Sequence, residues 1–176
     1  MEVREATSDD AAAIAAIYNQ GIEDRVATLE TELRTPDERR RWLLDRTSRH
    51  PVLVAVDDTG VAGWGSLNQF NPRPAYDHVA DFSVYVARDR RATGVGRVLL
   101  TALEERARTL GYHKMVLAAF PWNAGGVALY QRRGAVPAAW VPHHRHLSRA
   151  RGARRALGGR RDDGKDLVWT RPRRAR

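Results

Sequence analysis

The 176-residue sequence contains no cysteine, and this absence excludes several kinds of chemistry at once. Without cysteine there is no disulfide framework, no thiolate nucleophile and no cysteine-ligated metal centre. No apolar run approaches the ~20 residues that a membrane-spanning helix needs. Residues 1–5 are charged and lack the apolar stretch of a secretory signal. We therefore expect a cytoplasmic protein with no membrane association and no bound metal.

Charge is distributed unevenly along the chain. The formal net charge is +9, yet residues 1–144 carry 18 basic and 18 acidic side chains, so the whole excess lies in residues 145–176. Any electrostatic attraction to nucleic acid would belong to that basic region, because the body of the protein is neutral. We do not expect nucleic acid to be the main partner. A binding module that uses this region, with steeply salt-dependent affinity, is kept as the alternative from a different functional class.

The apolar pattern predicts one domain of mixed α/β (α+β) type over residues 1–170, followed by a basic tail at 171–176. Helical spacing and start signals predict helices that begin near residue 10 and cover 35–46, 95–110 and 123–133. Alternating or continuous apolar runs predict strands near 3–6, 51–56, 61–67, 82–86 and 115–119. Helices interleaved with strands favour a layer of helices on a mixed sheet.

The most informative segment joins a strand to a helix through a glycine-rich turn that contains Arg91, Gly94 and Gly96. The first amides of a helix have no partner within it and lie at the positive end of its dipole, so such a turn suits a diphosphate. Arg97 follows where the Walker motif requires lysine, and Leu99 stands where the dinucleotide fingerprint requires a small residue. Neither motif is therefore present. A helix start that binds no ligand is the alternative.

The spacing Arg91-x-x-Gly94-x-Gly96 resembles the acetyl-CoA motif of the GCN5-related N-acetyltransferases, the GNAT superfamily. Asn123 and Tyr130 fall where that family has an Asn and, seven residues later, a Tyr. Within the superfamily, the resemblance extends to the phosphinothricin and methionine sulfoximine acetyltransferases, including the arsinothricin-resistance enzymes. It covers about residues 2–135. The segments that carry it are 17–19, 27–30, 73–76 and 83–86.

The resemblance implies a mixed, mostly antiparallel sheet flanked by helices, in which two strands splay apart to bind acetyl-CoA. In this role the implied residues are Val84, Tyr85, Val86, Arg91, Thr93, Gly94, Val95, Gly96, Arg97, Asn123 and Tyr130. Asn123 would either bond to the pantetheine arm or anchor its own helix. The resembled enzymes are generally homodimers, so the resemblance also implies a dimer.

Two residues are implied in catalysis. The resembled subfamily has a Glu two residues before its Ser/Thr-Val-Tyr-Val strand, and Asp81 occupies that place here as the base, with a shorter reach that favours a bridging water. Tyr130 would give its phenolic proton to the departing thiolate, since an ordinary pKa of ~10 keeps it protonated. The backbone of Val84 or Val86 would polarise the thioester carbonyl. His78 is a competing base. A strand-end cap for Asp81 and a packing ring for Tyr130 are the structural alternatives.

The loop residues Arg73 and Tyr76 are implied to hold an anionic amino acid, because a guanidinium matches a carboxylate or phosphinate in a forked geometry. Thr28 and Glu30 would line the other wall, with Glu30 meeting the substrate ammonium. The implied reaction is direct transfer of an acetyl group to the amino group of a small amino acid or an analogue. Acetylation of a polyamine or a protein N-terminus remains open, as does a homologue that binds acetyl-CoA but turns over poorly.

The resemblance weakens after Ala135, which stands where the family usually has Phe. Residues 136–158 are rich in Arg and Ala, and we interpret them as an irregular loop or as the product of a reading-frame shift. The segment contains three histidines, His143, His144 and His146, which we interpret as solvated. Residues 166–170 again resemble the closing strand of the family.

Overall fold

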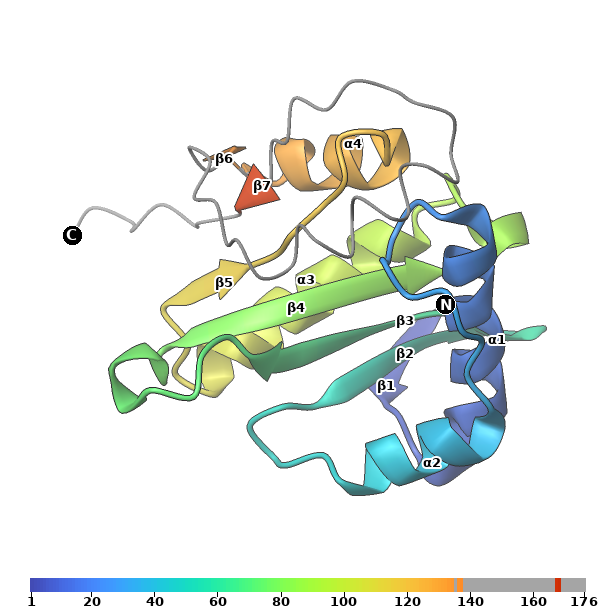
Figure 1. The fold of residues 1–176 in the computed structure, drawn as a ribbon, viewed down its shortest axis with the longest axis horizontal. Coiled ribbons are helices and arrows are strands. Elements are labelled where there is room, and N and C mark those ends of the chain that lie inside the picture. Colours follow the sequence, from blue (N-terminus) through green and yellow to red (C-terminus); the bar gives the residue numbers. More distant parts are fainter. Residues whose placement is uncertain (135, 138–166, 169–176) are drawn as a thin grey trace.

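The computed structural model describes residues 1–134, 136–137 and 167–168. Its main sheet has the order β1-β2-β3-β4-β5 (Figure 1). The strands of this sheet are β1 (Glu2–Glu5), β2 (Val52–Asp57), β3 (Gly60–Gln69), β4 (Val79–Val86) and β5 (Lys114–Val116). All neighbours are antiparallel except β4 and β5, which run parallel. The predicted mixed and mostly antiparallel sheet is therefore confirmed.

Helices cover both faces of this sheet. The helices are α1 (Ala11–Asp24), α2 (Pro36–Leu44), α3 (Val95–Thr109) and α4 (Ala124–Arg132), with short 3-10 turns η1 (Ser8–Asp10), η2 (Pro74–Tyr76) and η3 (Arg88–Arg90). α1 and α2 pack on one face, and α3 packs on the other (Figure 1). In the ranges that the structure describes, no helix is long and apolar enough to cross a membrane.

Two predicted boundaries differ from the structure. The second helix begins as expected, since Thr35 Oγ1 accepts the N–H of Glu38 at 3.2 Å and Glu38 Oε2 accepts the N–H of Thr35 at 2.6 Å. It ends at Leu44, two residues early. The strand predicted over 115–119 is wrong in length, because pairing ends at Val116 although Leu117 remains buried. The apolar composition of residues 115–119 predicted that the segment is buried. How many of its residues pair as a strand depends on the position of β4.

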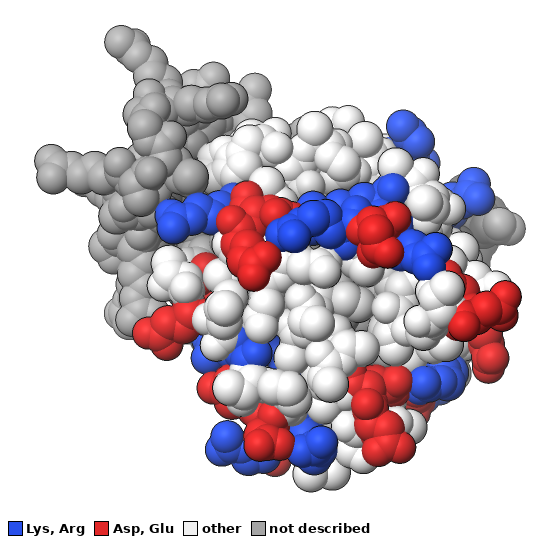
Figure 2. Space-filling view, turned by 90° about the vertical axis from the view of Figure 1, so that its right-hand side faces the viewer, with Lys and Arg blue, Asp and Glu red and all other residues white. Residues whose placement is uncertain are grey.

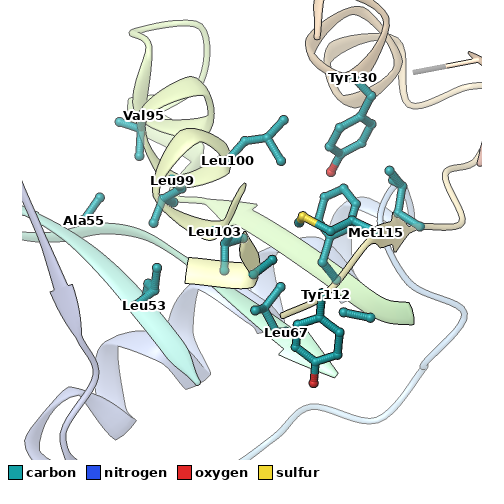
Figure 3. Packing of buried hydrophobic residues seen from close by; sticks show 14 of the residues in the cluster. Leu53, Ala55, Leu67, Val95, Leu99, Leu100, Leu103, Tyr112, Met115 and Tyr130 are labelled. Atoms are coloured by element: carbon teal, nitrogen blue, oxygen red, sulfur yellow. The ribbon is translucent and has the colours of Figure 1, made fainter. Parts of the chain in front are cut away.

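The core has two parts, one on each side of the sheet. On the α3 side, Leu99, Leu100 and Leu103 are fully buried and face the sheet, as Figure 3 shows. Leu99 and Leu103 belong to the stripe that helical spacing predicts, together with Val95, Ala102 and Leu110, whereas Leu100 was not part of it. On the α1 and α2 side, Ile14 of α1 packs with Trp64 of β3. Both faces of the sheet are therefore covered by packed side chains, which leaves its edges and strand ends accessible.

A second, short antiparallel pair joins β6 (Val136–Pro137) to β7 (Leu167–Val168), which confirms a strand within the predicted closing segment. Predictions about Ala135, residues 138–166 and the 171–176 tail lie outside the described residues, and so do those about the three histidines at 143, 144 and 146.

Candidate active site

β4 and β5 pair over three residues and then separate. Their parallel pairing ends at Asp81, and in the part of the chain that the structure describes no strand continues it along this edge of β4. The N–H of Ala87 donates to the carbonyl of Ala62 at 2.9 Å, so the odd-numbered residues of β4 pair with β3. Val84 and Val86 therefore turn their backbone groups toward the open edge. This is the splay that the resemblance implied. It leaves backbone groups of β4 without a strand partner, although the Val86 carbonyl accepts a hydrogen bond from Arg91 Nε at 3.4 Å.

The glycine-rich turn opens α3 beside that edge. Gly94 is the N-cap of α3 with a φ of +98°, and no heavy atom lies within 4 Å of a Cβ placed on it. This backbone conformation strongly favours glycine. Gly96 has a different role, because a Cβ there would lie 3.0 Å from Leu129 Cδ2 of α4, and that side chain would have to shift. Of the other residues predicted here, Val95 is buried, whereas Thr93 and Arg97 are exposed.

The arginine predicted to hold a diphosphate has a protein partner. Arg91 Nη1 lies 2.6 Å from Asp24 Oδ2 at the end of α1, and Arg88 Nη2 lies 2.8 Å from Asp24 Oδ1. Burial acts to raise the pKa of Asp24, but the hydrogen bonds from these two arginines lower it overall. Arg90 pairs with Asp57 in the same region. Figure 2 shows basic and acidic side chains interleaved in a band across this side of the molecule. The turn is thus tied to α1 and to the end of β2.

Asp81 lies where β4 and β5 part. Its side chain shares a face with Ser83 and Tyr85, the face covered by α1 and α2. Asn68, directly opposite on β3, donates from Nδ2 to Asp81 Oδ2 at 3.3 Å. Burial raises the pKa of Asp81 to about 6, against the lowering effect of Asn68 and of the Phe82 N–H. A carboxylate of this acidity is matched to accept a proton near neutral pH.

Tyr130 approaches the same point from the opposite face. It is buried on α4, and its ring packs edge-on against Phe82 with centroids 5.8 Å apart. Figure 3 shows its hydroxyl pointing from α4 toward Met115 of β5. Burial raises the pKa of Tyr130, so the phenol stays protonated at neutral pH. Asn123 Oδ1 accepts the N–H of Gly126 at 3.0 Å and caps α4, which corresponds to the anchoring role expected for it.

Tyr85 is placed in the core. Its ring stacks on Trp64 with centroids 4.6 Å apart and packs against Tyr18 at 5.0 Å. Burial raises the pKa of its phenol. Because its backbone pairs with β3, neither part of the residue faces the open edge. A contact between Tyr85 and the cofactor stays a prediction, and its position favours a supporting role beneath Val84 and Val86.

Thr28 and Glu30 line a pocket of about 170 Å³ between the loop after α1 and the loop after β5. The second loop contributes Phe120 and Trp122, whose rings stack with centroids 4.9 Å apart. Trp122 Nε1 donates to the carbonyl of Arg25 at 3.3 Å and so joins the two loops. The pocket combines apolar walls with a hydroxyl and a carboxylate, which suits a small amphiphilic molecule.

The carboxylate of Glu30 is engaged within its own loop. Arg34 Nε donates to Glu30 Oε2 at 2.7 Å, and an Nη2 contact accompanies it. Both side chains are partly exposed. A substrate ammonium would therefore compete with Arg34 for this carboxylate. The expected contact between Glu30 and an ammonium stays a prediction.

Arg73 and Tyr76 lie elsewhere. They are exposed in the loop that precedes β4, with the ring of Tyr76 against Phe70. Thr28 contacts Tyr18, which packs near the far end of β4. The eight residues of β4 extend over about 25 Å, and the two groups lie toward its opposite ends. Within one chain, the structure therefore does not bring Arg73 and Tyr76 together with Thr28 and Glu30 (Figure 1).

His78, the competing base, is exposed, and its ring packs against His113 with centroids 5.9 Å apart. Over residues 1–134 and the two short strands that follow, no three His, Asp or Glu side chains gather as metal ligands would. The histidine pair thus lies at the surface, and Asp81 remains the better enclosed of the two candidate bases.

Three residues of the site were not anticipated from the sequence. Asn68 became visible only through its register opposite Asp81. Phe120 and Trp122 lie within the three residues before the predicted helix cap Asn123, and two aromatic residues so close to a cap could have indicated a site.

Known proteins share this architecture. Residues 14–135 match the Acetyltransferase (GNAT) family. The putative phosphinothricin acetyltransferase YwnH of Bacillus subtilis is 36% identical over 135 residues, which are 76% of this chain and 83% of that protein. The L-methionine sulfoximine/L-methionine sulfone acetyltransferase of Pseudomonas aeruginosa is 36% identical over 134 residues, covering 75% and 78%. The structure of yncA, a putative acetyltransferase from Salmonella typhimurium with its cofactor acetyl-CoA, matches with a TM-score of 0.77 at 27% identity, covering 97% and 91%.

Proposed function

Because the chain belongs to the GNAT acetyltransferase family, we propose that it moves the acetyl group of acetyl-CoA to the amino group of a small amino acid or amino-acid analogue. The observation that carries this proposal is the position of Asp81 and Tyr130. They lie on opposite faces of β4, at the point where its edge opens beside β5. Acyl transfer needs a base on the side of the amine and an acid on the side of the sulfur, and this arrangement supplies both.

The open edge and the turn suit acetyl-CoA. The Val95 and Gly96 amides, which precede the first hydrogen bonds of α3, would hold the diphosphate, and Gly94 leaves space for it. The backbone of Val84 or Val86 would bond to the thioester carbonyl and stabilise the charge that develops on its oxygen. Acetyl-CoA, as the co-substrate, supplies an activated acetyl group.

Proton transfers complete the reaction. Asp81 takes a proton from the substrate ammonium, directly or through one water, and frees the nitrogen lone pair. The new N–C bond forms at the acetyl carbon as the C–S bond breaks. Tyr130 donates its phenolic proton to the departing sulfur. The nitrogen loses a second proton as the amide forms, and solvent returns a proton to the Tyr130 phenolate. The products are therefore the amide, the CoA thiol and one proton held on Asp81.

The acceptor is proposed to be an anionic amino acid of the kind that the relatives' names state, phosphinothricin or methionine sulfoximine. The pocket beside Thr28 and Glu30 supports a small acceptor because its volume is about 170 Å³. Arg73 and Tyr76 are proposed as anion contacts on the resemblance alone. We also propose that the protein acts in the cytoplasm as a homodimer, which light scattering of the purified protein tests.

A panel of acceptors tests the function directly. The purified protein is incubated with acetyl-CoA and, in turn, phosphinothricin, methionine sulfoximine, common amino acids, spermidine and a short peptide with a free N-terminus. We expect thiol release and an acetylated product with at least one amino-acid acceptor. Release with spermidine or the peptide alone would contradict the proposed acceptor class. Calorimetric binding of acetyl-CoA without thiol release would contradict catalysis itself.

Replacing Gly94 by alanine is expected to weaken acetyl-CoA binding about tenfold. An L-residue at a φ of +98° costs about 1–2 kcal/mol, so the start of α3 would rearrange and displace its free amides. Gly111→Ala is the matched control, since Gly111 follows the other end of α3 with a φ of +80° and equally open surroundings. Thermal unfolding should show similar losses for both variants. In calorimetry only Gly94→Ala should change the Kd, and equal Kd values would argue against this turn as the diphosphate site.

A further inference from the structure

Arg46 is a half-buried cation close to the candidate active site. It follows α2, and Arg46 Nε donates to the carbonyl of His50 at 2.6 Å. Its guanidinium also contacts the carbonyl of Leu67 on β3 and lies 4.9 Å from the Trp42 ring. Burial lowers the pKa of Arg46, yet a guanidinium stays charged in proteins. The half-buried guanidinium has specific hydrogen-bond partners, and one of them leads to the site.

That partner is Asn68. Arg46 Nη2 donates to Asn68 Oδ1 at 3.1 Å, while Asn68 Nδ2 donates to Asp81 Oδ2 at 3.3 Å. An amide has one accepting end and one donating end. A reversed Asn68 would place its NH2 against the guanidinium and its oxygen against the carboxylate, losing both bonds. The cation on one side thus decides which end of the amide faces Asp81 on the other.

We propose that Arg46 is a positioning residue for the acetyl transfer: it fixes the amide of Asn68 so that a donor is held on the carboxylate of Asp81. This inference rests on the proposed function, in which Asp81 is the base. Arg46 touches neither Asp81 nor the open edge of β4, so its influence passes through Asn68.

Among the groups around Asp81, the Asn68 amide is the side chain that influences the pKa of its carboxylate. β3 presents Asn68, and β5 presents Val116 opposite Asp81, with Lys114 two residues away opposite Val79. On β4 itself, the Phe82 N–H acts on the carboxylate. α1 contributes Tyr18 and α2 contributes Arg39. Arg39 packs on the Tyr18 ring, which packs on Tyr85, and Tyr85 is four residues beyond Asp81 on β4. The influences on the acidity of Asp81 are burial, Asn68 and Phe82, and only Asn68 is a side chain.

Loss of the fixed donor is expected to raise the pKa of Asp81 by about one unit above its value of about 6. The reason is that a hydrogen bond stabilises a charged carboxylate by a free energy that corresponds to about one pKa unit. The base then requires a higher pH to be ionised. The acid limb of the kcat/KM profile should move upward by the same amount in Arg46→Gln and in Asn68→Leu.

A double-mutant cycle separates positioning from mere support of the fold. The variants are Arg46→Gln, Asn68→Leu and the combination, each followed by the pH profile of kcat/KM and by ¹³C NMR titration of the Asp81 carboxyl, assigned by its loss in Asp81→Asn. If Arg46 acts through Asn68, the double variant shows no larger shift than Asn68→Leu alone. Two shifts that add would overturn the proposal, and so would an unchanged NMR pKa in Arg46→Gln. Should Arg46→Gln not fold, Arg46→Lys keeps the charge without the fork and is expected to give a smaller shift of the same sign, and no shift would overturn the proposal.

Arg49→Gln is the matched control. Arg49 lies in the same loop, donates to the carbonyl of Asp77 at 2.7 Å and packs 4.8 Å from the Tyr112 ring, but it has no bond to Asn68. We expect a comparable loss of thermal stability without a shift in either titration. The NMR readout also distinguishes the two levels of the argument. An upward NMR shift with an unmoved acid limb would show that Arg46 orients Asn68 against Asp81, but it would refute Asp81 as the base and with it the role of Arg46 in the transfer.

Discussion

Replacing Asp81 by asparagine is expected to lower kcat/KM by about 10²–10³-fold and to remove the acid limb near pH 6. The reason is that asparagine keeps the size and the place opposite Asn68 but cannot accept the ammonium proton. Initial rates of thiol release between pH 5 and 9 measure both effects. Asp81→Glu restores a carboxylate with a longer reach and should recover much of the rate. Asp58→Asn, in the exposed turn between β2 and β3, should leave the rate unchanged.

The same substitution has an opposite expected effect on stability. Burial raises the pKa of Asp81 from an ordinary 3.8 to about 6, so the folded protein holds this proton more tightly than the unfolded chain. The associated stability is present below about pH 4 and is lost as the pH rises through about 6. Asp81→Asn should therefore be more stable than the parent at pH 8, by up to about 3 kcal/mol, and about equally stable at pH 4.

Thermal unfolding at both pH values checks this sign. A variant that loses activity while gaining stability at pH 8 marks a residue retained for chemistry. If Asp81→Asn instead lost activity and stability together at pH 8, the carboxylate would be a structural cap at the strand, and the assignment of the base would fail.

Replacing Tyr130 by phenylalanine is expected to lower kcat about 10²-fold while leaving the KM for acetyl-CoA nearly unchanged. Phenylalanine keeps the ring that packs against Phe82, so only the proton for the departing sulfur is lost. Steady-state kinetics with varied acetyl-CoA provide the measurement. A thioester whose thiol is more acidic needs less protonation, so the gap between parent and variant should narrow with it.

Tyr112→Phe is the matched control for this prediction. Tyr112 belongs to the same core cluster, and its hydroxyl donates to the carbonyl of Arg49 at 2.9 Å. Its loss should cost about 1 kcal/mol of stability without an effect on kcat. A Tyr130→Phe enzyme within twofold of the parent rate, or an equal loss of rate in both variants, would remove Tyr130 from the role of acid.

Local patterns in the chain determined much of this protein. The Thr35 capping box, the apolar stripe of α3 and the glycine at position 94 each depend on residues a few positions apart, and each forms as expected. The motif at Arg91, Gly94 and Gly96 contributed to the family resemblance for the same reason, since a glycine-rich helix start is a local structure.

Only the tertiary structure decided which distant side chains meet. Pairing with β4 ends at Asp81, so β5 is shorter than predicted. Arg91, which was expected to contact the cofactor, forms an ion pair with Asp24. The link from Arg46 through Asn68 to Asp81 joins a loop and two strands. Strand register and helix packing set these contacts over long separations in sequence, where residue type alone cannot specify a partner.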